Sequence, residues 1–385
     1  MAMKAKTLCL LGGTVLSLAG CANLREAHAP SSGLLAFVGT QGDGPGQGIH
    51  AVRLDPANGT LTSLGLAAEA TRATWVLADS KRGRLFAVNE SGNDGVTQGQ
   101  VASYRFEPAS GALTKVSAVA SGGGGPTHLA LAPQGDALFT ANYGTGQVAS
   151  FRIGSDGRLA GPVAVDAHQG SGPTRRQKGP HAHGVTLDPG GHYLIAPDLG
   201  ADKVFVYRLG AVVGTFAAAE VPEVILPPGS GPRHIVFAPD GRHAFLMTEM
   251  AGTIYSFSWD AQRGRLSELT HIALDDETYQ GNRSGSEIAI SRDGRFVYAG
   301  NRGASCIQVY AVGKDAGLSL VQTIASGGQN PWSFTIGGSG KWLVVANQGT
   351  DNLAVFAVDK SSGRLADTGK RMTVGKPTSI AFTDR

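Results

Sequence analysis

Short apolar segments alternate with glycine-containing turns along almost the whole chain. In one unit, an apolar segment over residues 126–133 is followed by a glycine turn and a second apolar segment over residues 138–144. Equivalent units begin near Thr74, His183, Arg233, Ser286, Trp332 and Thr378. Because the segments are nearly continuous in Val, Ile, Leu and Phe, they predict strands that are buried on both faces. Turn pairs such as Asp-Gly and Gly-Arg predict antiparallel hairpins.

The repeat also predicts that these hairpins close into a ring. Each unit adds a third strand, such as residues 204–207, and a weaker fourth strand after a second turn. The last unit stops after its first strand, residues 379–382, and its missing second strand stands at the other end of the chain as residues 34–40. Such a split repeat is how a ring of blades closes. We therefore predict one all-β domain over residues 33–385, a seven-bladed β-propeller with four antiparallel strands per blade, whose last blade is closed by the N- and C-terminal strands.

The N-terminal segment is set apart from the repeat. Two lysines precede an apolar stretch that is too short to span a bilayer, and residues 18–21 match a cleavage site that ends in cysteine. We interpret residues 1–20 as a lipoprotein-type signal peptide, Cys21 as the lipidated residue and residues 21–32 as a tether. The protein is then expected to be exported and anchored to a membrane on its periplasmic side, and Ala22 favours the outer membrane. An ordinary secretory signal that contains Cys21 is the alternative.

The charge balance argues against nucleic acid as a partner. The formal charge is +3, and loss of Lys4 and Lys6 with the signal would leave +1. No basic run is longer than residues 175–178, so the chain lacks the basic stripe that a phosphate backbone requires. Cys306 would be the one cysteine left in the ring, so no internal disulfide can form and a small buried side chain is expected there. We expect a monomer.

The first hairpin of each unit brings chemically different residues to one end of the ring. The start of its first strand and the end of its second strand lie at the same end, which faces one mouth of the central channel. These positions vary between imidazoles, guanidiniums and carboxylates, as in a ligand site on a symmetric scaffold, although loop ends are polar in any protein. We expect substrate contacts from seven of them: His128, Tyr143, Asp198, His234, Glu287, Trp332 and Gln348.

Short polar phrases recur in a fixed order along the repeat, at residues 125–128, 180–183, 197–200, 231–234, 286–288 and 301–303. Together they resemble the seven-bladed lactonase family, which includes propeller-type 6-phosphogluconolactonases and fungal carboxymuconate cyclase. The resemblance covers residues 34–385. It implies hydrolysis of a sugar lactone, 6-phosphogluconolactone-like or unphosphorylated, at one channel mouth. It also implies a catalytic set of one His, two Arg and one Glu, which by motif position falls on His183, Arg233, Glu249 and Arg302.

Two positions depart from the family pattern. Trp332 stands where Arg is common, and Thr248 precedes Glu249 where Asn is usual. Arg supplies bidentate recognition of anions, so its loss at position 332 weakens the expectation of a phosphate or polycarboxylate ligand. An aromatic face instead suits a sugar ring.

Lactone hydrolysis needs a base to deprotonate water, a donor for the oxyanion and an acid for the leaving alkoxide. Glu249 or His183 can serve as the base. Arg233 can stabilise the oxyanion, and Arg302 can hold ring substituents or keep Glu249 ionised. Because mouth residues are expected to lie outside the core, substitutions there should leave the protein folded.

Neither a cofactor nor a metal is expected. The chain has no Gly-x-Ser-x-Gly nucleophile motif and no matched His or Cys spacing for a metal. Two alternatives stay open. A carboxymuconate-type cycloisomerase could use the same His and Arg groups on a polycarboxylate, although Trp332 counts against it. A surface-tethered binding or scaffold propeller without chemistry would fit the export signal, since sugar phosphates are chiefly cytosolic.

Overall fold

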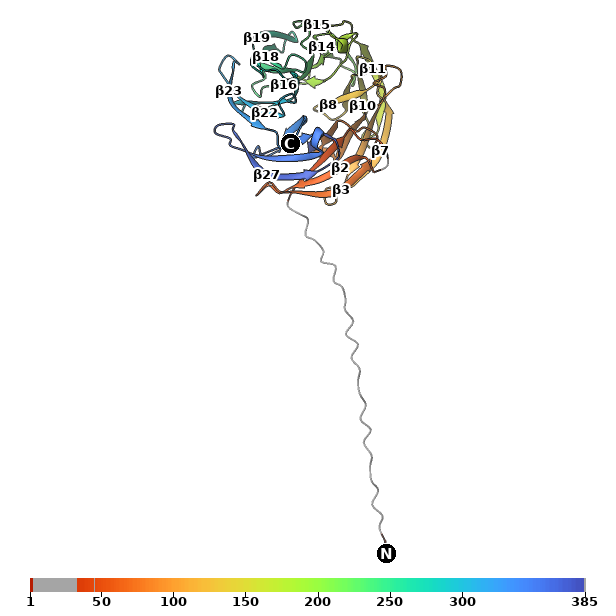
Figure 1. Cartoon of the computed structure of the whole chain (residues 1–385). Coiled ribbons are helices and arrows are strands. Elements are labelled where there is room, and N and C mark those ends of the chain that lie inside the picture. Colours follow the sequence, from red (N-terminus) through yellow and green to blue (C-terminus); the bar gives the residue numbers. More distant parts are fainter. Residues whose placement is uncertain (3–32, 45, 384–385) are drawn as a thin grey trace. The chain divides into compact units, whose positions relative to one another are not determined.

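Seven antiparallel sheets surround a central channel in the structure, a computed structural model that describes residues 1–2, 33–44 and 46–383 (Figure 1). Strands β1 to β28 form seven four-stranded sheets, each connected in simple order from the first strand of a unit to the fourth. A cavity of about 440 Å³ in the centre is lined by the first strands of all seven units. The prediction of a seven-bladed β-propeller with four strands per blade is therefore confirmed.

The strands occupy four positions from the channel outward. The innermost strands are β4 (Val76–Asp79), β8 (Pro126–Leu131), β12 (Thr186–Leu187), β16 (Pro232–Phe237), β20 (Gly285–Ile290), β24 (Pro331–Ile336) and β28 (Pro377–Phe382). The second strands are β5 (Arg84–Asn89), β9 (Ala137–Asn142), β13 (Tyr193–Asp198), β17 (His243–Thr248), β21 (Phe296–Asn301), β25 (Trp342–Asn347) and β1 (Leu34–Thr40). The third strands are β6 (Gln100–Phe106), β10 (Gln147–Ile153), β14 (Lys203–Leu209), β18 (Thr253–Asp260), β22 (Cys306–Val312), β26 (Asn352–Val358) and β2 (Gly48–Leu54). The outermost strands are β7 (Leu113–Ala120), β11 (Leu159–Ala167), β15 (Phe216–Ile225), β19 (Arg265–Ala273), β23 (Leu318–Ala325), β27 (Leu365–Thr373) and β3 (Leu61–Glu69). Short 3-10 helices in the described part of the chain are η1 (Ser80–Arg82), η2 (Arg175–Gln177) and η3 (Gln348–Thr350).

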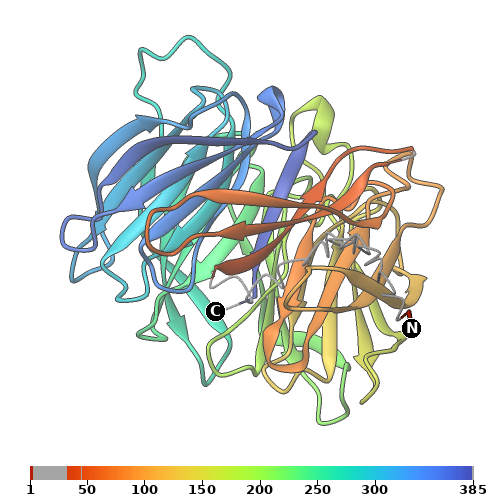
Figure 2. The same ribbon diagram turned by 90° about the horizontal axis from the view of Figure 1, so that it is seen from below.

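The two ends of the chain close the ring within one blade. β28 pairs with β1 in the register Ala36 opposite Phe382 and Phe37 opposite Ala381. Figure 2 shows these terminal strands, coloured blue and red, side by side. The Thr378 hydroxyl also donates to the carbonyl of Thr74 at 2.9 Å and so links this blade to the next one. Closure by the N- and C-terminal strands is thus confirmed.

Burial of apolar side chains between neighbouring blades holds the ring together. Seven apolar clusters lie at the seven blade-to-blade contacts, and one of them packs β1, β2 and β28 against β25 and β26. The second strands are buried along their length, as in β9, whereas the outermost strands alternate between half-buried and exposed positions, as in β3. Continuous apolar segments in the sequence therefore correspond to strands that neighbouring blades cover on both faces.

The described residues bear on only some of the expectations for the cysteines and the N-terminus. Cys306 on β22 is buried, and burial raises the pKa of its thiol to about 12. Cys21 and most of residues 1–32, on which the signal peptide and tether were predicted, lie outside the described residues. No helix long and apolar enough to cross a membrane is found in the described ranges.

Candidate active site

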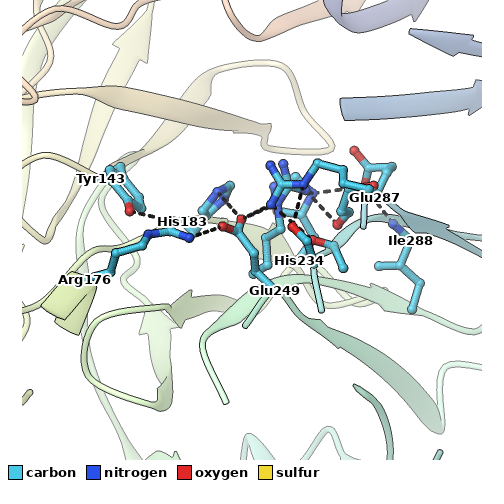
Figure 3. A network of polar contacts seen from close by, with 12 residues as sticks. Tyr143, Arg176, His183, His234, Glu249, Glu287 and Ile288 are labelled. Atoms are coloured by element: carbon cyan, nitrogen blue, oxygen red, sulfur yellow. Dashed lines mark hydrogen bonds and ion pairs between the residues drawn. The ribbon is translucent and has the colours of Figure 1, made fainter. Parts of the chain in front are cut away.

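Three arginines converge on the carboxylate of Glu249 at one mouth of the channel (Figure 3). Arg302 Nη2 lies 2.6 Å and Arg233 Nε 3.2 Å from Glu249 Oε2, while Arg176 Nη1 lies 2.7 Å from Oε1. His183 Nε2 is 3.7 Å from the same Oε2 atom. These side chains come from three consecutive blades and the loop before β12, so the structure brings all four predicted catalytic residues together.

The hairpin geometry places Glu249 beside Arg233. Glu249 follows β17, and its backbone N–H donates to the carbonyl of Gly231 at 2.7 Å, just ahead of β16. Gly231 has a φ of +62°, in the left-handed region that favours glycine. The turn therefore sends Arg233 and Glu249 from adjacent strand ends into the same space.

Glu249 is held as a carboxylate. Burial by itself would raise its pKa, but the guanidinium charges of Arg302, Arg233 and Arg176 lower that pKa well below the usual range of a glutamate. A carboxylate with so low a proton affinity is a weak general base. Its geometry instead suits it to hold the arginines in place.

Arg233 is a buried arginine, only 1% exposed. Its Nη1 donates to the carbonyl of Ser286 at 2.7 Å and lies 3.2 Å from His234 Nδ1. Burial and the nearby charge of Arg302 lower its pKa to about 10. Since Arg233 and Glu249 are both buried, the expectation that mouth residues lie outside the core is wrong for these two residues.

His183 carries a neutral imidazole. It is 7% exposed, and burial, followed by the charges of Arg233 and His234, lowers its pKa well below the usual value. Its ring meets that of Tyr143 edge-on at 5.5 Å. The segment before β12 is not a regular strand, and His181 on this segment stacks on Tyr143 at 4.7 Å.

Trp332 packs on Arg302. The guanidinium carbon of Arg302 lies 4.9 Å from the centre of the indole ring, a cation–π contact. Arg302 also donates from Nε to the Ser284 hydroxyl at 3.2 Å and from Nη2 to the carbonyl of Gly285 at 3.3 Å. The Trp332 indole therefore holds the Arg302 guanidinium against its ring face.

A second layer of polar side chains lies beneath Arg233, along the central cavity. His234 Nδ1 is 3.0 Å from Glu287 Oε1, and the His234 ring lies 4.6 Å from that of His128. His128 in turn lies against Trp75 at 4.1 Å. Burial lowers the pKa values of both histidines and raises that of Glu287. His128, His234 and Glu287 thus line the cavity, and His234 contacts Arg233.

Asp198 and Gln348 do not join the group around Glu249. The Asp198 carboxylate is fully buried, lies 2.7 Å from His168 Nδ1 and accepts backbone N–H groups that include that of His181 at 2.8 Å. Gln348 pairs with Gln41 at 2.8 Å and with Asn330 at 2.8 Å. In the described part of the chain, both side chains bond elsewhere than to the arginine cluster.

Asp198 was predicted to lie at the mouth as Tyr143 does, and this prediction is wrong by one residue. In all seven blades the residue directly after the second strand donates its N–H to a carbonyl ahead of the first strand, as Tyr143 does to Gly125. In the blade of β12 to β15 this residue is Leu199, which donates to His181. Asp198 corresponds instead to Asn142 at the end of β9. Residues that share its position serve the turn and do not face the mouth.

Sequence reasoning missed Arg176, whose guanidinium also donates to the Tyr143 hydroxyl at 3.0 Å. Arg176 lies on η2, in the long connection between β11 and β12, outside the repeated hairpins. The sequence offers only the basic run at residues 175–178 as a signal, and that run alone indicates a solvated surface. Elsewhere in the described chain, no group of three or more His, Cys, Asp or Glu side chains is placed to hold a metal ion.

Comparison with known proteins decides the family. The family model described as "Lactonase, 7-bladed beta-propeller" matches residues 35–382. The chain belongs to this lactonase family. Members hydrolyse lactones, so the protein is a carboxylic ester hydrolase of the lactonase type.

Relatives of this lactonase cover nearly its whole length. A 6-phosphogluconolactonase of Bacillus subtilis (strain 168) is 33% identical over 349 residues, which is 90% of this chain and 98% of the relative. The structure of the Pseudomonas aeruginosa periplasmic gluconolactonase PpgL has a TM-score of 0.85 at 38% identity and covers 91% of this chain and 98% of its own. A putative 6-phosphogluconolactonase from Bacteroides fragilis NCTC 9343 has a TM-score of 0.84 at 30% identity, with coverage of 91% and 98%. The resemblance inferred from the sequence is confirmed.

Proposed function

We propose that this lactonase hydrolyses a sugar lactone at the mouth around Glu249, with His183 as the general base. The observation that carries the proposal is the place of the His183 imidazole, whose Nε2 lies 3.7 Å from a carboxylate that the Arg233 and Arg302 guanidiniums share. A base, donors for an oxyanion and a charge that stabilises the protonated base are thereby gathered in one place.

The geometry favours His183 over Glu249 as the base. Glu249 is engaged by three guanidiniums, and its low pKa makes it a poor proton acceptor. The neutral imidazole of His183 has a free lone pair on one ring nitrogen. Once protonated, that ring is stabilised by the adjacent Glu249 carboxylate. Glu249 therefore acts on the reaction through His183 and through the arginines.

The reaction follows from these roles. A water molecule loses its proton to His183 as its oxygen attacks the carbonyl carbon of the lactone. The carbonyl oxygen becomes an oxyanion beside Arg233 and Arg302. The Arg233 Nη2 group and the Arg302 Nη1 group make none of the contacts described above, so both can donate to the oxyanion. When the ring C–O bond breaks, the imidazolium returns the proton to the leaving alkoxide. The product is an open-chain hydroxy acid.

The predicted substrate-binding residues take two kinds of place in this proposal. Tyr143 and Trp332 border the group around Glu249 and are proposed to contact the sugar. His128, His234 and Glu287 lie one layer deeper and are proposed to hold Arg233 in position. The names of the relatives, one a 6-phosphogluconolactonase and one a gluconolactonase, support a sugar lactone as the substrate class.

A direct assay tests the proposal. Purified protein is incubated with glucono-δ-lactone and with its 6-phosphate, and acid release is followed in a pH-stat. We expect turnover well above spontaneous hydrolysis for at least one of the two. Rates equal to the spontaneous rate for both substrates would contradict the proposal and leave a propeller that only binds ligands.

We further propose that the protein is an exported lipoprotein, anchored through Cys21 on the periplasmic side, with the outer membrane favoured, and that it is a monomer. The apolar stretch and the small residues before Cys21 support the anchor, and PpgL is named as periplasmic. Cys21→Ser should move the protein from the membrane fraction to the soluble periplasmic fraction. A native protein without acyl mass would contradict lipidation.

A further inference from the structure

We propose that Arg176 is the specificity-determining residue of this site, and that it binds an anionic group, phosphate or carboxylate, at the end of the sugar lactone remote from the reacting carbonyl. This inference rests on the proposed lactone hydrolysis. It concerns a residue outside the predicted catalytic set.

The charges around Glu249 do not balance. Three guanidiniums, those of Arg176, Arg233 and Arg302, share the single carboxylate of Glu249. The next carboxyl group, that of Glu287, lies against His234, and burial raises its pKa. Two guanidinium charges are therefore left without a carboxylate of their own within ion-pair distance in the described part of the chain. An oxyanion, which becomes the carboxylate of the product, matches one of them. With a neutral lactone the second charge stays unmatched, whereas an anionic substituent would match it.

Arg176 is the arginine that faces outward. Its side chain is 51% exposed, compared with 1% for Arg233 and 9% for Arg302. The two buried arginines therefore lie where the carbonyl reacts, and Arg176 lies where the rest of the ring emerges toward solvent. The guanidinium uses one N–H for Glu249 and one for the Tyr143 hydroxyl, so three of its five N–H groups are left over for a ligand.

The backbone beneath Arg176 is fixed, which distinguishes it from an ordinary surface arginine. The next residue, Gln177, is fully buried and donates to the carbonyl of Leu199 at 2.9 Å and to Asp202 Oδ1 at 2.7 Å. Asp202 also accepts the N–H groups of Gly229 at 2.7 Å and Gly231 at 2.8 Å. One buried carboxylate thus ties the Arg176 loop to the turn that positions Arg233.

Arg176 also supplies a guanidinium to a mouth that lacks the family's usual arginine at position 332. The family commonly has an arginine there, and this chain has a tryptophan that packs on Arg302. Arg176 pairs directly with Glu249 and donates to the Tyr143 hydroxyl beside it (Figure 3). A guanidinium that can bind an anion is therefore present at the mouth, although it comes from a loop instead of a strand.

The test compares Arg176→Ala with Arg175→Ala. Arg175 is the neighbouring residue on η2, is exposed, and its side chain makes no hydrogen bond or ion pair in the described part of the chain, so it is a matched control for lost charge. Three substrates are used: glucono-δ-lactone, its 6-phosphate and a glucarolactone. We expect Arg176→Ala to lower kcat/KM tenfold to a hundredfold for the anionic lactones, mainly through KM, and less than threefold for glucono-δ-lactone.

The outcomes separate clearly. A loss with the 6-phosphate alone, or with the glucarolactone alone, supports the proposal and says which anion is bound. An equal loss with all three substrates would overturn it, because Arg176 would then act on the reacting centre through Glu249. No loss with any substrate would overturn it as well.

A binding measurement keeps the inference testable if no lactone is turned over. Calorimetry compares three ring-opened acids, 6-phosphogluconate, glucarate and gluconate, with the native protein, Arg176→Ala and Arg175→Ala. Tighter binding of 6-phosphogluconate or glucarate than of gluconate, lost in Arg176→Ala and kept in Arg175→Ala, supports the inference even if the proposed hydrolysis fails. Equal affinity of all three acids for the native protein would overturn it.

Discussion

Two sides of the same channel mouth carry different side chains at equivalent backbone positions. On one side, Arg233, Glu249 and Arg302 form a buried charged cluster. On the other side, Gln348 follows β25 as Glu249 follows β17, yet it joins Gln41 and Asn330 in a chain of neutral amide hydrogen bonds. Because the hairpins of the two blades have the same backbone geometry, the difference between a charged and a neutral mouth lies in the side chains. The propeller provides the positions, and only one sector of it carries the charge for chemistry.

The largest expected difference in kcat and in the free energy of unfolding is that between Arg233→Ala and Gln348→Ala. Arg233→Ala should lower kcat on a turned-over lactone by about a hundredfold or more, because an oxyanion donor is lost. It should also reduce the free energy of unfolding by about 3–5 kcal/mol, because buried Glu249 loses a partner. Gln348→Ala should cost less than about 1 kcal/mol and change kcat less than threefold. Denaturant unfolding and initial rates measure both; equal effects of the two variants would contradict the asymmetry.

Trp332 lies where the charged sector begins and should give a smaller effect. Trp332→Ala removes the ring on which Arg302 packs, so we expect KM to rise about threefold to tenfold while kcat stays within a few-fold. Trp332→Arg places a second guanidinium there and should shift preference toward the phosphorylated lactone. Steady-state kinetics with glucono-δ-lactone and its 6-phosphate check this. A large fall in kcat for Trp332→Ala would instead place the indole at the reacting centre.

The pH dependence should show the smallest effect. His183 must be neutral to accept a proton, and its pKa is lowered by burial and by Arg233, so the neutral form persists below the ordinary histidine pKa of about 6.5. We therefore expect kcat/KM to stay flat from about pH 8 to about pH 6.5 and to fall only at lower pH. A pH-stat series, corrected for spontaneous hydrolysis, measures it. A fall that is half complete above pH 6.5 would show that the base has a raised pKa instead.

The fold and most of the site were accessible from the sequence because the repeat defines equivalent positions. The split last unit predicted the pairing of β28 with β1. The hairpin rule placed strand ends at one mouth, and the family resemblance selected His183, Arg233, Glu249 and Arg302 among them. A residue outside the repeated hairpins was missed. Arg176 lies in a connection outside the hairpins and is positioned by tertiary bonds of its neighbour Gln177.

Two other predictions were wrong. Asp198 was placed one residue out of register, although this hairpin keeps the interval of the others: Leu199 follows β13 as Tyr143 follows β9. The polarity of the mouth residues suggested exposure, whereas Arg233 and Glu249 are buried as partners of each other. Sequence shows which groups are polar, but their pairing in three dimensions decides whether they reach water.

Lactone turnover by His183→Asn, compared with the native protein and with His181→Asn, tests the central claim most directly. His181 is an imidazole two residues away that stacks on Tyr143, with its Nδ1 2.7 Å from that residue's carbonyl oxygen, so it controls for the loss of a nearby histidine. After correction for spontaneous hydrolysis, we predict that His183→Asn lowers kcat by about a hundredfold or more while His181→Asn stays within about fivefold. Equal turnover by His183→Asn and the native protein would contradict the role of His183 as the base and remove this site from catalysis.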